Sequence, residues 1–344
     1  MVNIKFLFAV ASCLGPALAA PVPCESQTSS VETPAATTAP AAPVPTDKVA
    51  SDSDAAFGFA SLNGGTTGGA GGPTTTVSSY DELAAAVEGD EPKIVIVSGT
   101  ISEEADQIDV GSNTSILGAD ASAVLDGFGL RIKRANNVII RNLGVKNVKA
   151  DNGDAIAGEY ATNVWIDHCD VSSNRDEDKD YYDGLLDFKR ASDYITISNT
   201  FIHDHYKSSL IGHSDSNAEE DEGKLRVTYA NNYWLNLNSR APSIRFGTAH
   251  LYNNYYENVS DAVNARIGAQ VLVESNVFSD VSKAVVSRYS DEDGYAVVRD
   301  NDLGDAESSA PEGSLTSVEY EYELLGAENV KAAVVGTAGQ TLSF

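Results

Sequence analysis

The hydrophobic positions of this chain form short apolar runs that end in asparagine. Val-Thr-Tyr-Ala-Asn-Asn is typical of these runs, and others rich in β-branched or aromatic residues close in the same way. In order, the closing residues are Asn142, Asn199, Asn232, Asn254, Asn276 and Asn301. From Asn199 onward the steps between them are 33, 22, 22 and 25 residues. A period of this length indicates stacked coils rather than a sheet of hairpins.

A β-branched run closed by a polar turn residue can bury its inner face only when another coil stacks on it. We therefore predict an all-β fold, a right-handed parallel β-helix, in which each asparagine lies directly above the last. Stacked side-chain amides can hydrogen-bond along the axis, which explains asparagine at these positions. The alternative is a β-sandwich, whose strands usually recur every 8 to 12 residues through tight turns.

Both ends of the predicted coil stack have candidate covers. Ser79 and Glu82 form a capping box, and Tyr80, Leu83 and Val87 fall on one helical face. This short helix precedes the first clear strand, 93–97, and is expected to plug the open end of the core. At the other end, 319–325 and the Ala-rich 329–335 are expected to pack along the outside.

The N-terminal region carries no core pattern. Residues 1–19 combine one lysine, an apolar run and the small-residue sequence Ala17-Leu18-Ala19, which is typical of a secretory signal peptide. Residues 20–54 are rich in Ala, Pro, Thr and Ser without periodicity, which predicts a flexible segment. We assign 55–344 to the β-helix domain and expect a secreted protein.

Glycine dominates 57–72, which suggests a phosphate-binding loop at first sight. The segment lacks a Gly-Lys-Ser/Thr ending, and no strand precedes it. It is better interpreted as extended chain that must approach another backbone closely.

Charge limits the possible partners. The 344 residues carry a formal net charge of −27 at pH 7, with 42% hydrophobic and 21% charged residues. Nucleic acids and anionic membranes require basic patches, so neither is expected as a partner. The balance favours solubility and cation binding.

The cysteines and the N-glycosylation triplets are two further features that bear on a secreted protein. Once the signal peptide is removed, only Cys24 and Cys169 remain, too few for a disulfide framework, and a buried free Cys169 is the favoured state. Asn113 and Asn258 fit the N-glycosylation pattern. Asn258 follows a strand end and is the more accessible candidate, whereas Asn113 opens an apolar stretch.

Three aspartates lead into consecutive coils: Asp154, Asp183 and Asp187. Stacking would bring their carboxylates to one face, where they repel one another unless a hard cation sits among the oxygens. Ca²⁺ takes six to eight oxygen ligands and is the usual extracellular choice. The alternative is that each aspartate is a solvated loop residue.

Basic residues follow in the next coils. Arg240 and Arg245 would point to opposite faces of a straight strand, but Pro242 between them favours a bend that lets them converge. Lys189 shares the strand face of Asp187, and Lys207 ends the following coil. Four cations beside three carboxylates favour a site that grips a polyanion partly through bridging metal. An outward salt-bridge network is the alternative.

At these residues the chain resembles the secreted pectate lyases of the pectate lyase superfamily. The resemblance runs from about residue 57 to the C-terminus and rests on five segments in the family's order. They are Phe-Ala-Ser-Leu-Asn-Gly-Gly-Thr-Thr-Gly-Gly-Ala-Gly-Gly, Asn-Val-Trp-Ile-Asp-His, Tyr-Asp-Gly-Leu-Leu-Asp-Phe-Lys, Lys-Ser-Ser-Leu-Ile-Gly-His-Ser-Asp and Arg-Ala-Pro-Ser-Ile-Arg-Phe-Gly.

The resemblance implies a parallel β-helix and Ca²⁺-dependent β-elimination of polygalacturonate to unsaturated oligogalacturonates. It assigns the calcium to Asp154, Asp183 and Asp187, the abstraction of the proton to Arg240, and the substrate carboxylates to Lys207 and Arg245; Lys189 is a further candidate. Where some relatives have an acidic residue two places before Asp154, this chain has Asn152. A further calcium that bridges the substrate is expected to bind more weakly here.

Three alternative functions fit these residues less well than a pectate lyase does. A pectin lyase acts on methyl-esterified polymer without calcium and would not need the three aspartates. A polygalacturonase hydrolyses with clustered acids and lacks the Arg-x-Pro-x-x-Arg signature. An inactive β-helix that binds wall polysaccharide would not need the full set of aspartates, arginines and lysine. We expect a monomer.

Overall fold

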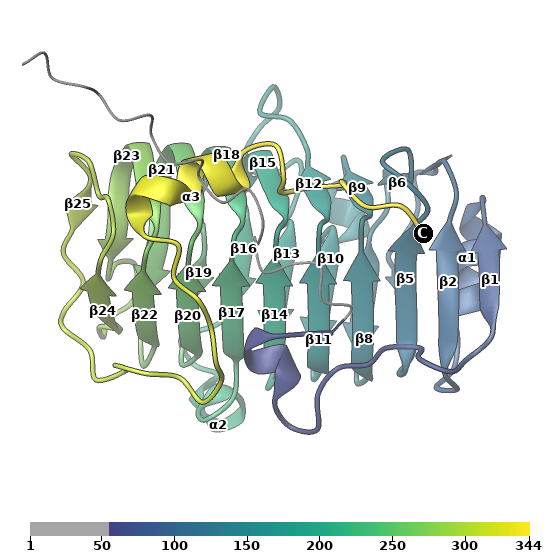
Figure 1. Cartoon of the computed structure of the whole chain (residues 1–344), viewed down its shortest axis with the longest axis horizontal. Helices are drawn as coiled ribbons and strands as arrows, with labels where there is room; N and C mark the ends of the chain where they lie inside the picture. The colour runs from purple at the N-terminus through teal and green to yellow at the C-terminus, as the bar shows by residue number, and fades with distance from the viewer. Residues whose placement is uncertain (1–54) are drawn as a thin grey trace, which may run out of the picture. The chain divides into compact units, whose positions relative to one another are not determined.

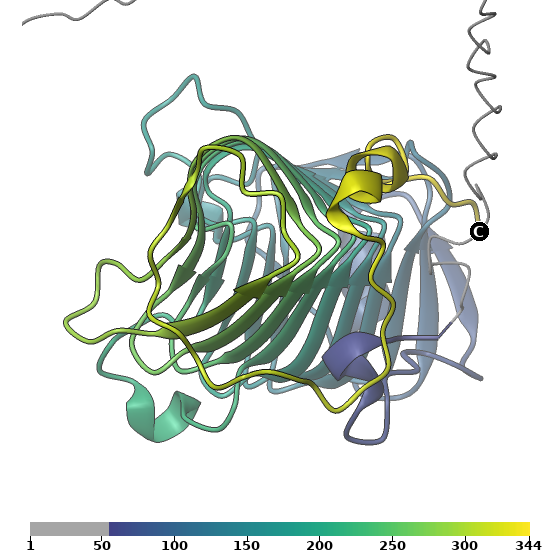
Figure 2. The ribbon, with the colours of Figure 1, turned by 60° about the vertical axis from the view of Figure 1, so that its left-hand side comes forward.

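The computed structural model describes residues 55–344 of the chain. The expected signal peptide, the segment 20–54 and Cys24 lie outside the described residues, so the predictions for them stay predictions. Within the described part, parallel strands follow one another in coils that stack along one axis (Figure 1). Figure 2 shows the coils closer to end-on, with the strands wound around one axis. Buried hydrophobic side chains fill the space inside the coils. The predicted parallel β-helix is confirmed.

One long sheet contains one strand from each of ten coils, in the order β1-β2-β5-β8-β11-β14-β17-β20-β22-β24. Its strands are β1 (Thr74–Val77), β2 (Lys93–Val97), β5 (Thr114–Gly118), β8 (Asn136–Arg141), β11 (Thr162–Asp167), β14 (Asp193–Ser198), β17 (Arg226–Ala230), β20 (Thr248–Tyr252), β22 (Gln270–Glu274) and β24 (Tyr295–Arg299). Each inner face adds Val, Ile or Leu to one continuous core, and no sandwich forms.

The other two sides of the coils are joined through one strand, β21 (Tyr255–Ala265). Its first half pairs with β18 and its last residues pair with β19, because the strand runs across a bend. On one side lie β3 (Thr100–Ser102), β6 (Val124–Asp126), β9 (Gly144–Lys146), β12 (Asp170–Ser172), β15 (Phe201–Lys207) and β18 (Tyr233–Ser239), with β23 (Val277–Val286) and β25 (Glu307–Ser308) beyond β21. On the other lie β4 (Ile108–Asp109), β7 (Leu130–Lys133), β10 (Ile156–Glu159), β13 (Leu186–Lys189), β16 (Ser209–Ile211) and β19 (Ser243–Ile244).

The asparagine ladder forms as predicted in the later coils. The side-chain amides of Asn232, Asn254 and Asn276 each donate to the side-chain oxygen of the next asparagine, at 2.9 to 3.0 Å, and the ladder ends on Asn301. Asn199 is not part of this ladder, because strand pairing places Thr200 above Asn232. The predictions for Asn199, and for Asn142 at the equivalent place two coils earlier, were therefore one residue out of register.

The physical reason for that shift is the geometry of the bend, which uses two residues. The first adopts the left-handed conformation, and Asn142 (φ 55°), Asn199 (φ 48°) and Asn231 (φ 58°) all do so. The second turns inward and carries the ladder. Asparagine suits both positions, since its short side chain tolerates left-handed backbone and its amide stacks well. The residue type alone does not show which of the two positions an asparagine occupies.

The N-terminal end is closed by helix α1 (Tyr80–Val87), as predicted. Ser79 caps the helix by accepting from the Glu82 amide at 3.4 Å, and Leu83 and Val87 are fully buried in the core. The sequence prediction missed strand β1, which precedes the helix and pairs with β2. Its four-residue sequence, Thr-Thr-Thr-Val, lacks an apolar run because only its last residue is buried.

The glycine-rich segment lies against the outer face of the ten-stranded sheet, as expected of a close wrap (Figure 1). In its short 3-10 helix η1 (Gly58–Ser61), the backbone amides of Phe59 and Ala60 donate to the hydroxyl oxygens of Thr228 on β17 and Thr196 on β14. A Cβ at Gly69 would lie only 1.8 Å from the carbonyl oxygen of Lys93. Any other residue would force the segment off the sheet.

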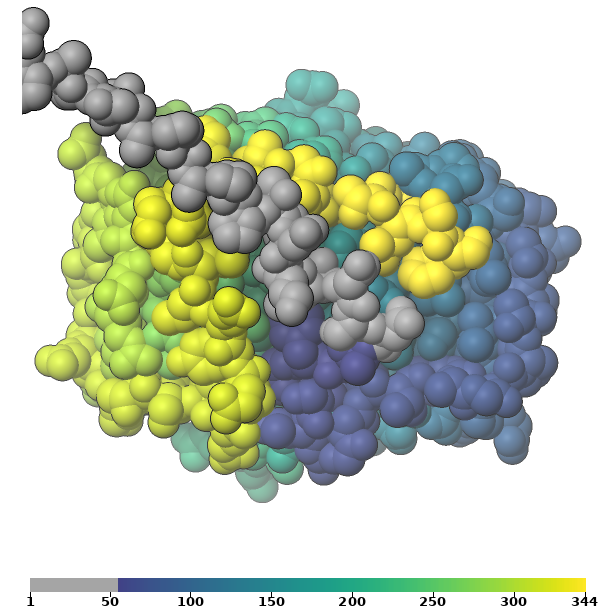
Figure 3. Space-filling model, viewed as in Figure 1, coloured from purple at the N-terminus to yellow at the C-terminus, as the bar shows by residue number. Residues whose placement is uncertain are grey.

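The C-terminal segment covers the outside of the coils and turns back from the last coils toward the first (Figure 3). Its helix α3 (Ala327–Val334) buries Val330 and Val334 against Tyr255 and Val277. The last residues reach Asn142, which exchanges two hydrogen bonds with Leu342 at 2.9 Å. The predicted outer cover is confirmed.

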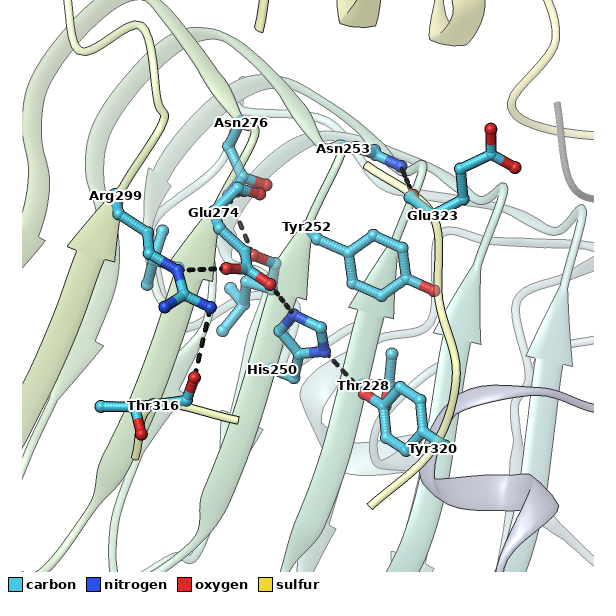
Figure 4. Close-up of polar contacts among 12 residues, drawn as sticks. Thr228, His250, Tyr252, Asn253, Glu274, Asn276, Arg299, Thr316, Tyr320 and Glu323 are labelled. Atoms are coloured by element: carbon cyan, nitrogen blue, oxygen red, sulfur yellow. Dashed lines mark hydrogen bonds and ion pairs between the residues drawn. The ribbon is translucent and has the colours of Figure 1, made fainter. Parts of the chain in front are cut away.

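A buried polar network fastens this segment to the ten-stranded sheet (Figure 4). His250 has no exposed surface; its Nδ1 lies 2.8 Å from the Tyr320 hydroxyl and its Nε2 lies 3.1 Å from Glu274. Glu274 also accepts from Arg299 at 2.6 Å, and Arg299 donates to the Thr316 carbonyl. Every buried polar head named here has a partner, so the network stabilises the fold.

The protonation of this network should make stability depend on pH. Burial lowers the pKa of His250, although its hydrogen bond with Glu274 acts in the opposite direction. Burial alone would raise the pKa of Glu274, but hydrogen bonds with His250, Tyr322 and Arg299 lower it to about 2. As the pH falls, each group binds its proton in the unfolded chain before it does so in the folded protein. Stability from these groups is therefore lost as pH falls below about 6.5 for the histidine and below about 4.5 for the glutamate.

We expect Glu274→Gln to lower the Tm at pH 7 by roughly 5 °C, because one partner of a buried ionic network is removed. The variant should also lose less Tm than the wild type between pH 5 and pH 3. Thermal unfolding followed by circular dichroism at both ends of the range measures this. Parallel curves for the two proteins would contradict the role assigned to Glu274.

Cys169 is a free, fully buried cysteine, as expected, and burial raises the pKa of its thiol to about 12. Among the described residues 55–344, no helix has the length and apolar character needed to cross a membrane.

Candidate active site

Asp154 and Asp187 meet on the side of the coils formed by β10 and β13. Asp154 lies two residues before the start of β10, and Asp187 lies on β13, which pairs with β10 in parallel. Both are only 5% exposed. Asp154 accepts from the Gly184 amide at 2.9 Å, and Asp187 accepts from the Leu210 amide at 2.9 Å. Stacking thus joins two carboxylates that are 33 residues apart in the sequence.

The two carboxylates face the same small space. A Cβ at Gly184 would lie 2.6 Å from Oδ1 of Asp187 and 2.8 Å from Oδ1 of Asp154. Burial and the charge of Asp183 raise the pKa of Asp154, while burial and the charge of Asp154 raise the pKa of Asp187 well above its usual range. Glycine at 184 leaves room between oxygens that need a cation.

Asp183 is close to this pair but points elsewhere. Its carboxylate lies 3.3 Å from the ammonium of Lys207, and its side chain is 45% exposed. Its backbone oxygen accepts from Nε2 of His205. Within residues 55–344, no three His, Cys, Asp or Glu side chains are already gathered as a metal site. The three-aspartate ligand set stays a prediction, with two members converging.

The residues present fit a divalent cation. Two buried carboxylate oxygens share a space that only glycine leaves open, and a third carboxylate lies within electrostatic range. Hard oxygen donors of this kind suit Ca²⁺, which fills its remaining positions with water or substrate oxygen. A structural ion-pair network explains the pair less well, since Asp154 and Asp187 form no ion pair with any described residue.

Basic side chains occupy the coils that follow. Lys207 ends β15, and its ammonium lies 3.2 Å from Asp180 and 3.3 Å from Asp183. Arg240 lies between β18 and β19 with a left-handed backbone (φ 59°), and its carbonyl accepts from the Ser209 amide and the Ser208 hydroxyl. The chain bends between Arg240 and Pro242, as predicted from the proline.

The guanidinium of Arg240 forms no hydrogen bond or ion pair with another described residue. Its charge nevertheless acts on both Asp154 and Asp187 and helps to keep their carboxylates ionised. Among the predicted site residues, Arg240 is therefore the cation whose head is held near the carboxylates without being neutralised by one of them. This is the arrangement expected of a group that acts on a ligand.

Arg245 lies after β19 and is 8% exposed. Its Nε forms an ion pair with Asp215, and its Nη1 donates to the Gly212 carbonyl at 2.9 Å. Arg266, one coil further along, lies 3.4 Å from the same Asp215 oxygen. Burial, and then the charge of Arg245, lower the pKa of Arg266 to about 10. The two guanidinium groups are therefore close neighbours.

Lys189 has a different environment from the other cations. It shares the face of β13 with Asp187, as predicted, but its ammonium lies 3.6 Å from Glu159 on β10. The substrate-binding role suggested for Lys189 stays a prediction. Its charge also lowers the pKa values of Asp154 and Asp187 against burial, so it contributes to the site at least through its field.

Sequence analysis did not identify Arg266 or Asp215 as part of this site. The register places Ile244 beside Ala265, so Arg245 and Arg266 follow at equivalent places on neighbouring coils. A finer alignment of the repeats would have shown this for Arg266. Asp215 lies in the quoted Gly-His-Ser-Asp segment, but nothing in its spacing connects it with arginines 30 and 51 residues away.

The two glycosylation triplets differ in exposure. Asn258 is exposed on β21, and its amide contacts only Asn236, at 3.2 Å. Asn113 donates to the Asp90 carbonyl and accepts from Asn137, while Thr114 and Ser115 of the same triplet are buried. The structure keeps Asn258 as the accessible candidate.

Sequence comparison matches most of the chain to one family. Residues 36–343 match the family model described as pectate lyase. Pectate lyase A of Emericella nidulans is 69% identical over 344 residues, covering all of both chains. Pectate lyase A of Aspergillus niger is 62% identical over 345 residues, again covering all of both.

Solved structures of similar fold include a pectate lyase from Bacillus sp. N165 in complex with trigalacturonate. It has a TM-score of 0.77 and 34% sequence identity, and the match covers 83% of this chain and 98% of that one. Pectate lyase II from Xanthomonas campestris gives a TM-score of 0.73 at 28% identity, over 84% of this chain and all of that one.

Proposed function

The chain is an enzyme of the pectate lyase family, and we propose that it cleaves (1→4)-α-D-galacturonan by calcium-dependent β-elimination. The observation that supports this most directly is the meeting of two buried carboxylates, Asp154 and Asp187, with the unpaired head of Arg240. A cation held by Asp154 and Asp187 would bind the carboxylate of a uronate. The guanidinium of Arg240 would act on the carbon beside that carboxylate, which must lose a proton.

We assign calcium to Asp154 and Asp187, with Asp183 as a third ligand that would have to leave its contact with Lys207. When bound, calcium neutralises the substrate carboxylate and stabilises the negative charge that develops beside it. Lys207 binds a neighbouring substrate carboxylate, and Arg245 and Arg266 bind another further along the coils. The field of these cations prearranges the site for charge formed in the transition state.

Arg240 is assigned as the group that removes the proton from carbon 5. The electron pair of that C–H bond forms the double bond between carbons 4 and 5, and the bond from carbon 4 to the glycosidic oxygen breaks. The departing oxygen takes a proton from water, and Arg240 returns the proton it removed to the hydroxide that remains, so the products are a reducing end and an unsaturated uronate. Arginine is an unusual base because a free guanidinium keeps its proton in water.

The test is an assay on polygalacturonate with and without chelator. We expect the ultraviolet absorbance of the unsaturated product to rise only with calcium present, and the rate to fall as methyl esterification of the polymer increases. Faster turnover of highly esterified polymer without calcium would indicate a pectin lyase. Binding without product would indicate an inactive polysaccharide-binding protein.

For Lys207→Ala we expect a KM for polygalacturonate raised about tenfold and a lower kcat, because a charge-assisted contact with substrate is lost. Its partners Asp180 and Asp183 lose a counterion as well, so the Tm should be recorded for the same preparation. A lower Tm with unchanged kinetics would assign Lys207 to a structural ion-pair network.

We propose that the protein is secreted, on the signal-peptide pattern of residues 1–19, and that it acts as a monomer. In a eukaryotic secretory host we expect one N-linked glycan, at Asn258 and not at Asn113. Peptide mapping by mass spectrometry before and after enzymatic deglycosylation measures both sites. Occupancy of Asn113 would contradict the burial argument, and intact residues 1–19 in the secreted protein would contradict the signal peptide.

A further inference from the structure

Asp215 holds a position that the reaction itself does not require. It lies in the loop between β16 and helix α2 (Ala218–Asp221), and its carboxylate contacts both Arg245 and Arg266. Although burial opposes it, these contacts, led by the Arg245 hydrogen bond, lower the pKa of Asp215. We propose that Asp215 is a positioning residue, which clamps Arg245 and Arg266 into a site for a single uronate carboxylate. This inference rests on the proposed pectate lyase function.

The hydrogen bonds of Arg245 leave part of its guanidinium free. Of its five N–H donors, one on Nε binds Asp215 and one on Nη1 binds the Gly212 carbonyl. Three donors remain. Because the head is fixed at two points and is 8% exposed, the free donors keep one direction. A planar guanidinium fixed in this way is preorganised for a carboxylate.

Charge points to the same conclusion. The charge of Arg245 disfavours the charged form of Arg266, so the two heads repel when nothing lies between them. The two positive charges of Arg245 and Arg266 and the negative charge of Asp215 leave a net charge of +1. A single substrate carboxylate balances that remainder. Without Asp215, the guanidinium groups would move apart and lose their common direction.

The loop that carries Asp215 is itself anchored. Gly212 has φ 78°, and a Cβ there would lie 2.9 Å from the Arg245 carbonyl oxygen. Beyond Asp215, the fully buried Asp221 of α2 accepts from the Ala191 amide. Asp215 therefore sits between two fixed points, as a positioning role requires.

The experiment compares Asp215→Ala and Asp215→Glu with wild type on polygalacturonate at saturating calcium. We expect Asp215→Ala to raise KM about tenfold with kcat changed by less than about threefold, and Asp215→Glu to recover part of the loss. Added to Arg245→Ala, the same change should have almost no further effect on KM, because Asp215 acts through that arginine. Asp193→Asn, which alters an Asp–Arg226 pair of the ten-stranded sheet, is the matched control and should leave KM unchanged.

Each other outcome overturns the inference. A lower KM for Asp215→Ala would mean that the carboxylate competes with substrate, and an unchanged KM would mean that the contact is only structural. Independent, additive effects with Arg245→Ala would exclude the clamp. These results are read against a wild type that forms unsaturated product with calcium, so failure of the proposed function itself appears separately, as an inactive wild type.

Discussion

Arg240→Lys should leave the β-helix and the calcium affinity intact and reduce kcat by about 100- to 10,000-fold, the range of a general base. Lysine keeps the positive charge that acts on Asp154 and Asp187, so the carboxylates retain their electrostatic partner. It lacks the planar guanidinium, and its shorter reach changes the position of the proton acceptor. The loss should therefore fall on the chemical step.

Turnover of polygalacturonate at saturating calcium measures this effect, with Tm as the check on folding. Arg226→Lys provides a matched control, because Arg226 pairs with Asp193 on the ten-stranded sheet. It should retain wild-type kcat. If Arg240→Lys kept more than about a tenth of wild-type kcat, Arg240 would not be the group that removes the proton.

Asp187→Asn should raise the calcium concentration needed for half-maximal activity by at least about tenfold, with activity recovered at high calcium. Asparagine preserves the shape and the acceptor for the Leu210 amide but removes one charge from the Asp154–Asp187 pair. In chelator, the variant should have a Tm equal to or above that of the wild type, because two buried carboxylates no longer repel each other.

Rate against calcium concentration, and Tm with and without calcium, give both readouts. Asp193→Asn is again the control, since it removes a carboxylate of the same type away from the site. A surface pairing of Asp187 with Lys189 would instead cost about 0 to 1 kcal/mol and leave the calcium curve unchanged. Identical curves for variant and wild type would end the metal-ligand assignment.

The fold was accessible from the sequence because its signals are local and repeated. Each coil carries its own β-branched run and polar bend, so the period predicts stacking without knowledge of distant contacts. The capping helix was equally local, with Ser79 and Glu82 three residues apart. The missed strand β1 and the shift at Asn199 arose where burial or backbone conformation, rather than residue type, decides the role.

The candidate site divides in the same way. The sequence by itself determined the coils, the order of the acidic and basic segments, and the residues near the bend at Pro242. Only the tertiary structure decided that Asp183 turns to Lys207, that Lys189 lies beside Glu159, and that Asp215 joins Arg245 to Arg266. Such partners are 24 to 51 residues apart in the sequence, and the choice among them depends on strand register and side-chain direction. Periodicity brings coils together, but packing between them selects which charged groups touch.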